Sequence, residues 1–342
     1  MSRRRNDSNP SIVGTVFGII FALAILGAGG YALYLAMTGE QPEFLRPIFA
    51  PETLEEPVVE EPTLAPKPFA DYSWDELGQI SDLITAAADS DAAYAVAHEF
   101  GLVGDDGRIT TDTLLTQLDD GTIVDVHLVG ILHDDRADGS GKAGLTFMAG
   151  VMAQQPMEPT ASVEGGWRDS QLRGWLGSTG IDLLPDDLAK ELVIVTKTSN
   201  NFGGWRYDRM DERAIEDFIS TTDDSLWLFA AHEVCGDCAW MVGEYGAGYM
   251  MGTSDRYDAI VNAEGTQYEA FWQAGITNEG DISGLLAMRD KGAASAWWYR
   301  TPHPVLGRDG EPELFYQVMA SGHPFSVAQA DAIGGVVVGF CI

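Results

Sequence analysis

Basic residues are scarce in this 342-residue chain: 20 Lys and Arg stand against 52 Asp and Glu, for a formal net charge of −32. A chain this acidic repels nucleic-acid phosphates and anionic lipid surfaces. We therefore expect no nucleic-acid partner. Hydrophobic residues still make up 45% of the chain and nine residues are Trp, so the acidic groups are expected on the surface of a folded protein and not in a disordered tail.

Recognisable catalytic motifs are also lacking. No G-x-S-x-G nucleophile elbow occurs, and His232-Glu233 has no second histidine to complete an HExxH metal site. The six histidines are scattered, and carboxylates are too numerous for any one pair to indicate glycoside hydrolysis. The sequence therefore names no catalytic residue.

Charged residues are absent from residues 11–38, an apolar run longer than the roughly 20 residues that cross a bilayer as a helix. Three arginines precede the run within residues 1–10, whereas glutamates follow it, and this asymmetry puts the N-terminus in the cytoplasm. We expect a single-pass anchor in the cell membrane, with everything after it extracellular. A signal peptide cleaved near Ala28 is the alternative.

Residues 39–70 hold seven prolines among glutamates, a composition that predicts an extended, solvated stalk. Residues 71–119 then carry apolar residues at helical spacing in two runs. Ser73 and Glu76 have the spacing of a capping box at the start of the first run. We expect two helices that pair as a small hairpin.

From residue 120 onward the pattern changes to that of strands. In TIVDVHLVGIL, residues 122–132, one face is apolar and the other is apolar except for Asp125 and His127, as is typical of a mostly buried strand. Alternation in AWWYR predicts that one of Trp297 and Trp298 faces inward. Because strands and helices do not alternate regularly, we expect an α+β class, with a mixed, mainly antiparallel domain over residues 120–342. Further strands are expected at 192–198, 225–231, 295–301, 314–320 and 334–342, and helices at 167–177 and 185–192.

The stretch HDDRADGSGKAGLTF, residues 133–147, partly satisfies three ligand-binding patterns. Its GxGxxG does not open an expected helix, its Gly-Lys lacks the hydroxyl of a phosphate loop, and its calcium-loop pattern lacks two ligands. A turn that connects two strands is the favoured interpretation. An irregular calcium site formed by Asp134, Asp135 and Asp138 is the alternative.

Cysteine is rare, and the three cysteines are Cys235, Cys238 and Cys341. The CxxC motif follows an expected strand instead of opening a helix, which disfavours thioredoxin-like redox chemistry. Outside the cell two thiols are expected to form a disulfide, and we predict the pair Cys235–Cys341, which would tie the last strand to the middle of the domain. A zinc site that adds His232 to the cysteines is the alternative.

Aromatic residues in Gly- and Asn-rich loops offer further binding groups. Trp205 and Tyr207 lie in NNFGGWRYD, and Tyr245 and Tyr249 lie in WMVGEYGAGYM. Rings on such loops can stack on sugars or anchor a protein partner. We take these residues as the candidate ligand-binding set.

Residues 120–342 resemble an uncharacterised family of surface domains found in secreted and anchored proteins of Gram-positive bacteria. The matching blocks, in order, are IVDVHLVGILHDDRADGSGKAGLTFMA, GGWRDSQLRGWL, LPDDLAKELVIVTKTSNN, TTDDSLWLFAAHEVCG, NAEGTQYEAF, SAWWYRTP and GGVVVGFCI. The resemblance implies an extracytoplasmic module and assigns no activity. The WWYR and GFCI strands are also distantly similar to the last strands of C-type-lectin-like and sulfatase-modifying-factor-like domains, which implies a lectin-like fold.

These features predict a membrane-anchored cell-surface module that binds an extracellular glycan, cell-wall polymer or protein. The sequence assigns no cofactor with certainty, and calcium at Asp134, Asp135 and Asp138 stays open as an alternative. An extracytoplasmic enzyme and a structural envelope protein stay open as alternatives.

Overall fold

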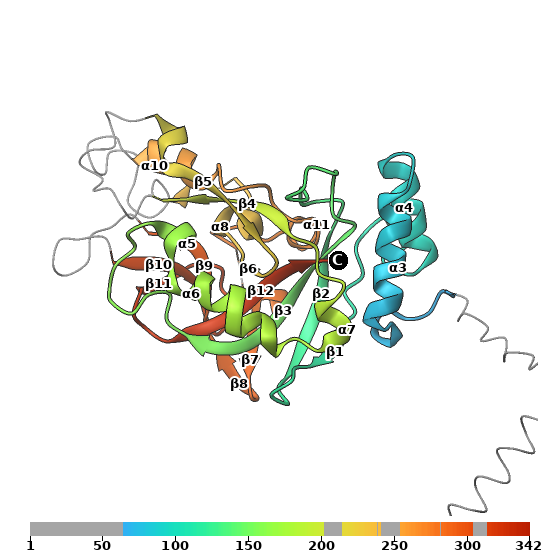
Figure 1. Cartoon of the computed structure of the whole chain (residues 1–342). Coiled ribbons are helices and arrows are strands. Elements are labelled where there is room, and N and C mark those ends of the chain that lie inside the picture. The colour runs from blue at the N-terminus through green and yellow to red at the C-terminus, as the bar shows by residue number, and fades with distance from the viewer. Residues whose placement is uncertain (1–63, 202–213, 238, 241–253, 281, 304–312) are drawn as a thin grey trace, which may run out of the picture. The chain divides into compact units, whose positions relative to one another are not determined.

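The computed structural model describes residues 64–201, 214–237, 239–240, 254–280, 282–303 and 313–342 (Figure 1). Leu64–Ile342 forms one compact unit. The tail expected at 1–10, the anchor at 11–38 and most of the stalk lie outside the described residues. Within the part of the chain that is described, no helix has the length and apolar character needed to span a membrane.

Strands and helices of this unit confirm the α+β class. The strands are β1 (Leu114–Gln117), β2 (Ile123–Ile131), β3 (Leu145–Gln155), β4 (Val195–Asn200), β5 (Ile219–Asp224), β6 (Trp227–Leu228), β7 (Met288–Asp290), β8 (Ala293–Ser295), β9 (Trp297–Pro302), β10 (Leu314–Val318), β11 (Ser326–Gln329) and β12 (Gly334–Cys341). The α-helices are α3 (Trp74–Thr85), α4 (Ser90–Glu99), α5 (Gly166–Asp169), α6 (Gln171–Trp175), α7 (Asp186–Ala189), α8 (Ala231–Cys235), α10 (Ser254–Val261) and α11 (Glu269–Gln273). Shorter helical turns are η2 (Phe69–Asp71), η3 (Leu176–Gly180), η4 (Ile181–Leu183), η7 (Ile215–Phe218) and η9 (Gly284–Leu286).

The described strands build an eight-stranded sheet in the order β1-β2-β3-β12-β9-β10-β11, with β6 also paired to β12. Neighbouring strands are antiparallel except β12 and β9, which are parallel. The last strand, β12, therefore runs through the middle of the sheet (red in Figure 1). Two-stranded sheets β4–β5 and β7–β8 accompany the large sheet.

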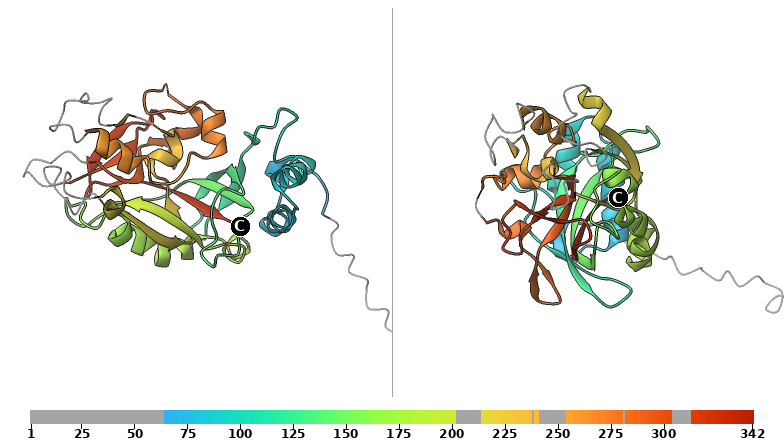
Figure 2. Two further views of the ribbon diagram at one scale, coloured as in Figure 1. Left: turned by 90° about the horizontal axis from the view of Figure 1, so that it is seen from above. Right: turned by 90° about the vertical axis from the view of Figure 1, so that its left-hand side faces the viewer.

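Apolar cores cover both faces of the sheet. In β12, Val336, Val338 and Phe340 belong to one core, whereas Val337 belongs to the other. Helices α3 to α7 contribute to the first core, and α8, α10 and α11 contribute to the second. The left view of Figure 2 shows the orange helices on one side of the red strands and the light-green helices on the other.

This two-sided burial corrects one expectation. Trp297 faces the second core and Trp298 the first, and both side chains are fully buried. The expectation that one of the two rings faces inward assumed a sheet with one solvent-exposed face, and it is wrong because both faces are covered.

The predicted helical hairpin is present and packs on the first core. The Ser73 hydroxyl accepts from the Glu76 amide and the Glu76 carboxylate accepts from the Ser73 amide, which confirms the capping box. The Trp74 ring stands edge-on to Phe147 and Phe340, with centroids 5.5 and 5.6 Å away. Helices α3 and α4 thus belong to the same unit as the sheet.

The stalk ends earlier than the expected residue 70. Phe69 in η2 is buried, and its ring stacks on Phe147 at a centroid distance of 6.4 Å. Lys67 forms an ion pair of 2.6 Å with Glu76 in α3. Residues 64–70 are therefore part of the compact unit.

Residues 132–144 connect β2 to β3 as a turn, as predicted, and the last residues of the quoted stretch, 145–147, begin β3. Asp135 and Lys142 face each other in an isolated antiparallel bridge, and their side chains form an ion pair of 2.9 Å. Gly139 and Gly141 have φ values of 74° and 126°, a region in which glycine has no steric cost. A strand follows this stretch, so the dinucleotide-binding interpretation is excluded.

Candidate functional site

Among the described residues of this acidic chain, one lysine and one arginine are buried. Lys197 on β4 is 4% exposed, and Arg300 on β9 is 0% exposed. A charge transferred from water to a protein interior is strongly destabilised unless it is paired and hydrogen-bonded. The partners come from segments that are far apart in the sequence.

Lys197 uses all three of its ammonium hydrogens. Its Nζ lies 2.6 Å from Asp134 Oδ1 and 2.7 Å from Glu233 Oε1, and it donates to the Tyr268 hydroxyl at 2.8 Å. The Tyr268 hydroxyl in turn donates to Asp134 Oδ1 at 3.0 Å. The ammonium also lies 4.7 Å from the centroid of the Trp227 ring, within the range of a cation–π contact.

The Asp134–Lys197 pair is ionised at neutral pH. Burial alone would raise the pKa of Asp134, but Lys197, His133 and a hydrogen bond from Thr146 outweigh it and lower this pKa to about 2. Burial disfavours the charged form of Lys197, yet Asp134 and Glu233 raise its pKa. The pair therefore places two charges in the interior that depend on each other.

Arg300 and Glu233 form a bidentate ion pair. Arg300 Nη1 donates to Glu233 Oε2 at 2.6 Å, and Nη2 donates to Oε1 at 2.8 Å. The other guanidinium hydrogens go to the Ser199 hydroxyl and to the carbonyls of Leu228 and Thr198. Glu233, which contacts both cations, joins the two ion pairs into one network.

Glu264 is the member of this network whose carboxyl group titrates near neutral pH. Its Oε1 accepts from the Asn200 amide at 2.9 Å, and its Oε2 accepts from the Thr301 hydroxyl at 2.6 Å. Burial raises the pKa of Glu264 to about 7, because attraction to Arg300 offsets only part of the desolvation. Glu233 is buried as deeply, but its direct pairing with Arg300 keeps its pKa below the usual value.

His133 packs against the network through Tyr268. The two rings stack with centroids 4.0 Å apart. His133 Nδ1 lies 3.2 Å from Glu269, and Nε2 lies 3.1 Å from the Thr266 hydroxyl. Burial opposes protonation of His133, but Glu269 and Asp134 outweigh it and raise the pKa. Contacts at both nitrogens fix the orientation of this ring.

A polar cavity of about 280 Å³ opens beside the network. The β2–β3 connection, β4, α8 and the turn after α10 form its wall, so the buried ions position every side. The cavity offers hydrogen-bond donors and acceptors at fixed positions, which suits a polar ligand. Its lining residues are His133, Asp134, Asp135, Lys142, Thr196, Lys197, Thr198, Glu233, Ala263, Gly265 and Thr266.

The three aspartates expected as calcium ligands have separate roles. Asp134 is buried in the network, Asp135 pairs with Lys142 at the surface, and Asp138 accepts from the Ser140 amide at 2.9 Å inside the turn. Among the described residues, no three His, Cys, Asp or Glu side chains are grouped so that they could hold a metal ion. The structure therefore brings no calcium-ligand set together at these aspartates.

The predicted disulfide between Cys235 and Cys341 is wrong. The two buried cysteines are not joined, because Cys341 belongs to the first core and Cys235 to the second. Cys341 Sγ lies 3.2 Å from the Thr146 hydroxyl, and Cys235 Sγ lies 3.9 Å from the Tyr299 hydroxyl. Helix α8 begins at Ala231, the last residue of the expected strand, and ends at Cys235, so the CxxC motif lies at the end of a helix and does not directly follow a strand. The zinc alternative includes Cys238, which lies outside the described residues.

The aromatic ligand-binding candidates Trp205, Tyr207, Tyr245 and Tyr249 also lie outside the described residues. They stay a prediction.

Sequence reasoning missed Lys197, Arg300 and Glu233. Each stands within an apolar run, in LVIVTKT, SAWWYRT and LFAAHEV respectively. Charged residues are almost never fully buried unless they are paired, so charges of both signs inside apolar segments are a usable signal for a buried ionic network.

No protein-family model, curated protein or solved structure matches the chain. Its function must therefore be argued from the chemistry of the site.

Loss of the buried ammonium should destabilise the fold strongly. We expect Lys197→Met to lower the free energy of unfolding by about 3–5 kcal/mol, because it leaves buried carboxylates without their counter-charge. Lys190→Met is the matched control, since Lys190 also lies 2.6 Å from a carboxylate, that of Asp75, but this pair is about half exposed and should contribute little. Urea unfolding followed by Trp fluorescence measures both variants. Equal losses of unfolding free energy in the two variants would contradict the claim that burial makes the Lys197 ion pairs matter more to stability than the exposed Lys190 pair.

Glu264 should make stability depend on pH in one particular window. Its folded pKa of about 7 exceeds the ordinary 4.5, so its contribution is complete below about pH 4.5 and is lost as the pH rises through about 7. Glu264→Gln cannot ionise, and we expect its unfolding free energy to fall less across this window. Asp134 has a pKa of about 2, so it titrates below this pH window and does not contribute to the change. If the unfolding free energies of the variant and of the original chain change with pH in parallel, the pKa of Glu264 is not raised in the folded protein and the prediction is wrong.

Proposed function

We propose that this chain is a membrane-anchored cell-surface binding module that holds a neutral extracellular glycan in the polar cavity beside the Lys197 network. The observation that carries this proposal is the lining of the cavity, where hydroxyl, carboxylate and ammonium groups are positioned by buried ions.

The lining matches the hydrogen-bonding needs of a sugar. Sugar hydroxyls donate and accept, so a site that binds them needs partners of both kinds. Thr196 and Thr198 supply hydroxyls, Asp135 supplies an acceptor and Lys142 supplies a donor. Because the segments that carry these groups are fixed before the ligand arrives, little conformational entropy is lost on binding.

Size and charge narrow the class of ligand. The volume of about 280 Å³ lies near the lower end of small-molecule sites, roughly 300–1,000 Å³, which favours a single sugar unit over a protein surface. The net charge of −32 repels polyanions such as phosphate-linked cell-wall polymers. Neutral sugars, N-acetylated ones included, are therefore the proposed ligands.

The anchor and the lectin-like fold belong to the same proposal. Residues 11–38 would hold the module at the cell membrane with its C-terminal domain outside, and residues 39–63 would act as the stalk. The two strands that carry the lectin-like resemblance, β9 and β12, are neighbours in the sheet. This pairing supports a distant relationship to C-type-lectin-like domains and to the bacterial surface family.

A variant that fills the cavity tests the proposal. Ala263 is exposed on the cavity wall, so Ala263→Trp should block the cavity without removing an ion of the network. We expect the original chain to bind neutral or N-acetylated oligosaccharides on a glycan array, and Ala263→Trp to lower the affinity at least roughly tenfold, a change of about 1.4 kcal/mol.

Ala259→Trp is the control, because Ala259 is an exposed alanine on α10 outside the cavity lining. It should leave binding unchanged, and both variants should keep the melting temperature of the original chain. Binding that survives in Ala263→Trp, or an array on which the original chain binds no glycan, would refute the assignment.

A further inference from the structure

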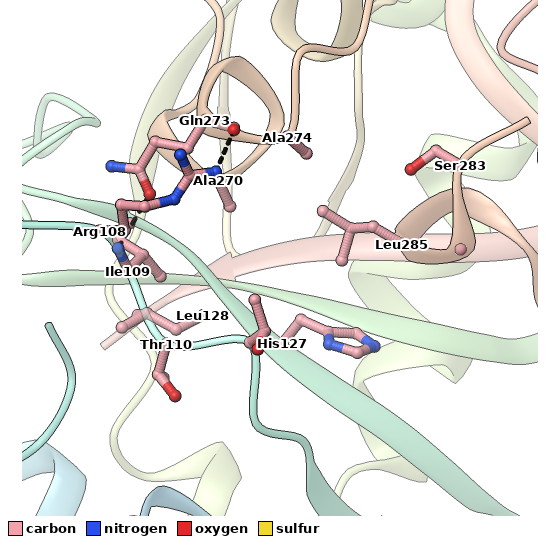
Figure 3. Close-up of a pocket in the computed structure, with 12 residues that line it drawn as sticks. Arg108, Ile109, Thr110, His127, Leu128, Ala270, Gln273, Ala274, Ser283 and Leu285 are labelled. Atoms are coloured by element: carbon pink, nitrogen blue, oxygen red, sulfur yellow. Dashed lines mark hydrogen bonds between the residues drawn. The ribbon is translucent and has the colours of Figure 1, made fainter. Parts of the chain in front are cut away.

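A second cavity, of about 360 Å³, lies between β2, α11, η9 and the segment that precedes β1 (Figure 3). Its volume falls within the range of small-molecule sites, roughly 300–1,000 Å³. It shares no lining residue with the polar cavity. The glycan proposal therefore leaves it without a role.

Apolar atoms form most of the wall of this second cavity. Leu128 on β2 and Ile109 are buried below its surface, and Leu285 in η9 faces it from another element (Figure 3). Ala270 and Ala274 of the α11 segment add small apolar groups. Such a wall favours a ligand with an apolar body.

One end of the cavity carries a positive charge. Arg108 donates through Nη2 to the Gln273 carbonyl, and the Ile109 amide donates to Gln273 Oε1 at 2.9 Å, so the segment before β1 is tied to α11. The ion pairs among the described residues include none with Arg108. Its guanidinium keeps donors that fit a carboxylate, which pairs with arginine in a charge-assisted, often bidentate manner.

The other end is uncharged at neutral pH. Figure 3 shows the His127 ring on the side of the cavity away from Arg108. Burial lowers the pKa of His127, so the ring presents a neutral surface. The cavity is thus polarised, with a cation at one end and apolar or neutral groups elsewhere.

We infer that this second cavity binds a small amphipathic carboxylic acid, with its apolar body against Ile109, Leu128 and Leu285 and its carboxylate at Arg108. The site is independent of the polar cavity and of the glycan proposal. Either can fail while the other holds, because the lining residues differ.

Three probes of one shape test the charge preference. The full-length chain in lipid nanodiscs is titrated with 3-phenylpropionate, with the corresponding neutral amide and with 3-phenylpropylamine, and binding is followed by saturation-transfer NMR against empty nanodiscs. We expect the acid to bind roughly tenfold or more tightly than the other two, as charge-assisted hydrogen bonds allow. Equal binding of all three probes, or no binding of the acid, would overturn the inference.

Arg108→Gln should abolish the preference for the acid. Arg289→Gln is the matched control, because Arg289 is also exposed and also donates to a backbone carbonyl, that of Gly292 at 2.8 Å, but lies outside the cavity lining. It should keep the full preference. If both variants lose it equally, the charge at Arg108 is not what selects the ligand.

Gly284→Phe tests the location. A Cβ at Gly284 would meet no atom within 4 Å, so the new ring should enter the cavity without strain and reduce binding of the acid at least roughly tenfold. A Cβ at Gly177 would also meet no atom within 4 Å. The Gly177→Phe variant should bind the acid normally, because Gly177 does not line the second cavity. Binding that persists in Gly284→Phe contradicts the site. If this variant does not fold, the Arg108 and Arg289 pair still decides the question.

Discussion

The burial of Lys197 and Arg300 is the constraint on which the arrangement of this domain depends. The low dielectric of the interior makes an unpaired charge very costly, so both cations require carboxylates at hydrogen-bond distance. Glu233 on α8 contacts both of them, and Asp134 reaches Lys197 from the β2–β3 connection. One network therefore fixes how four segments that are distant in sequence meet.

The polar cavity is a consequence of this network. Its walls are the same segments that the ions hold, and its buried lining residues, Asp134, Lys197 and Glu233, are the ions themselves. A cavity built on mobile loops would have to order its side chains when a ligand binds, whereas here the order exists beforehand. The net charge of −32 then disfavours polyanionic ligands, which it repels, and does not disfavour neutral ones.

Local features of the fold could be predicted from the sequence, but long-range ones could not. The capping box of Ser73, the strand over Ile123–Ile131 and the turn at residues 132–144 all follow from neighbouring residues. Asp134 was interpreted as a possible metal ligand because its partner, Lys197, lies 63 residues away. The disulfide prediction failed for a similar reason, since local spacing does not reveal on which face of the sheet each thiol lies.

The most direct test of the ionic network is native-state hydrogen exchange at the backbone amides of Asn200, Ala230 and Ala231. These amides donate to the side chains of Glu264, Glu233 and Thr301 respectively. If the network is intact in solution, they should exchange only through global unfolding, as slowly as amides in the middle of β12. Exchange at the rate of an exposed turn would contradict the account, because it would show that the side chains of the network do not hold these segments.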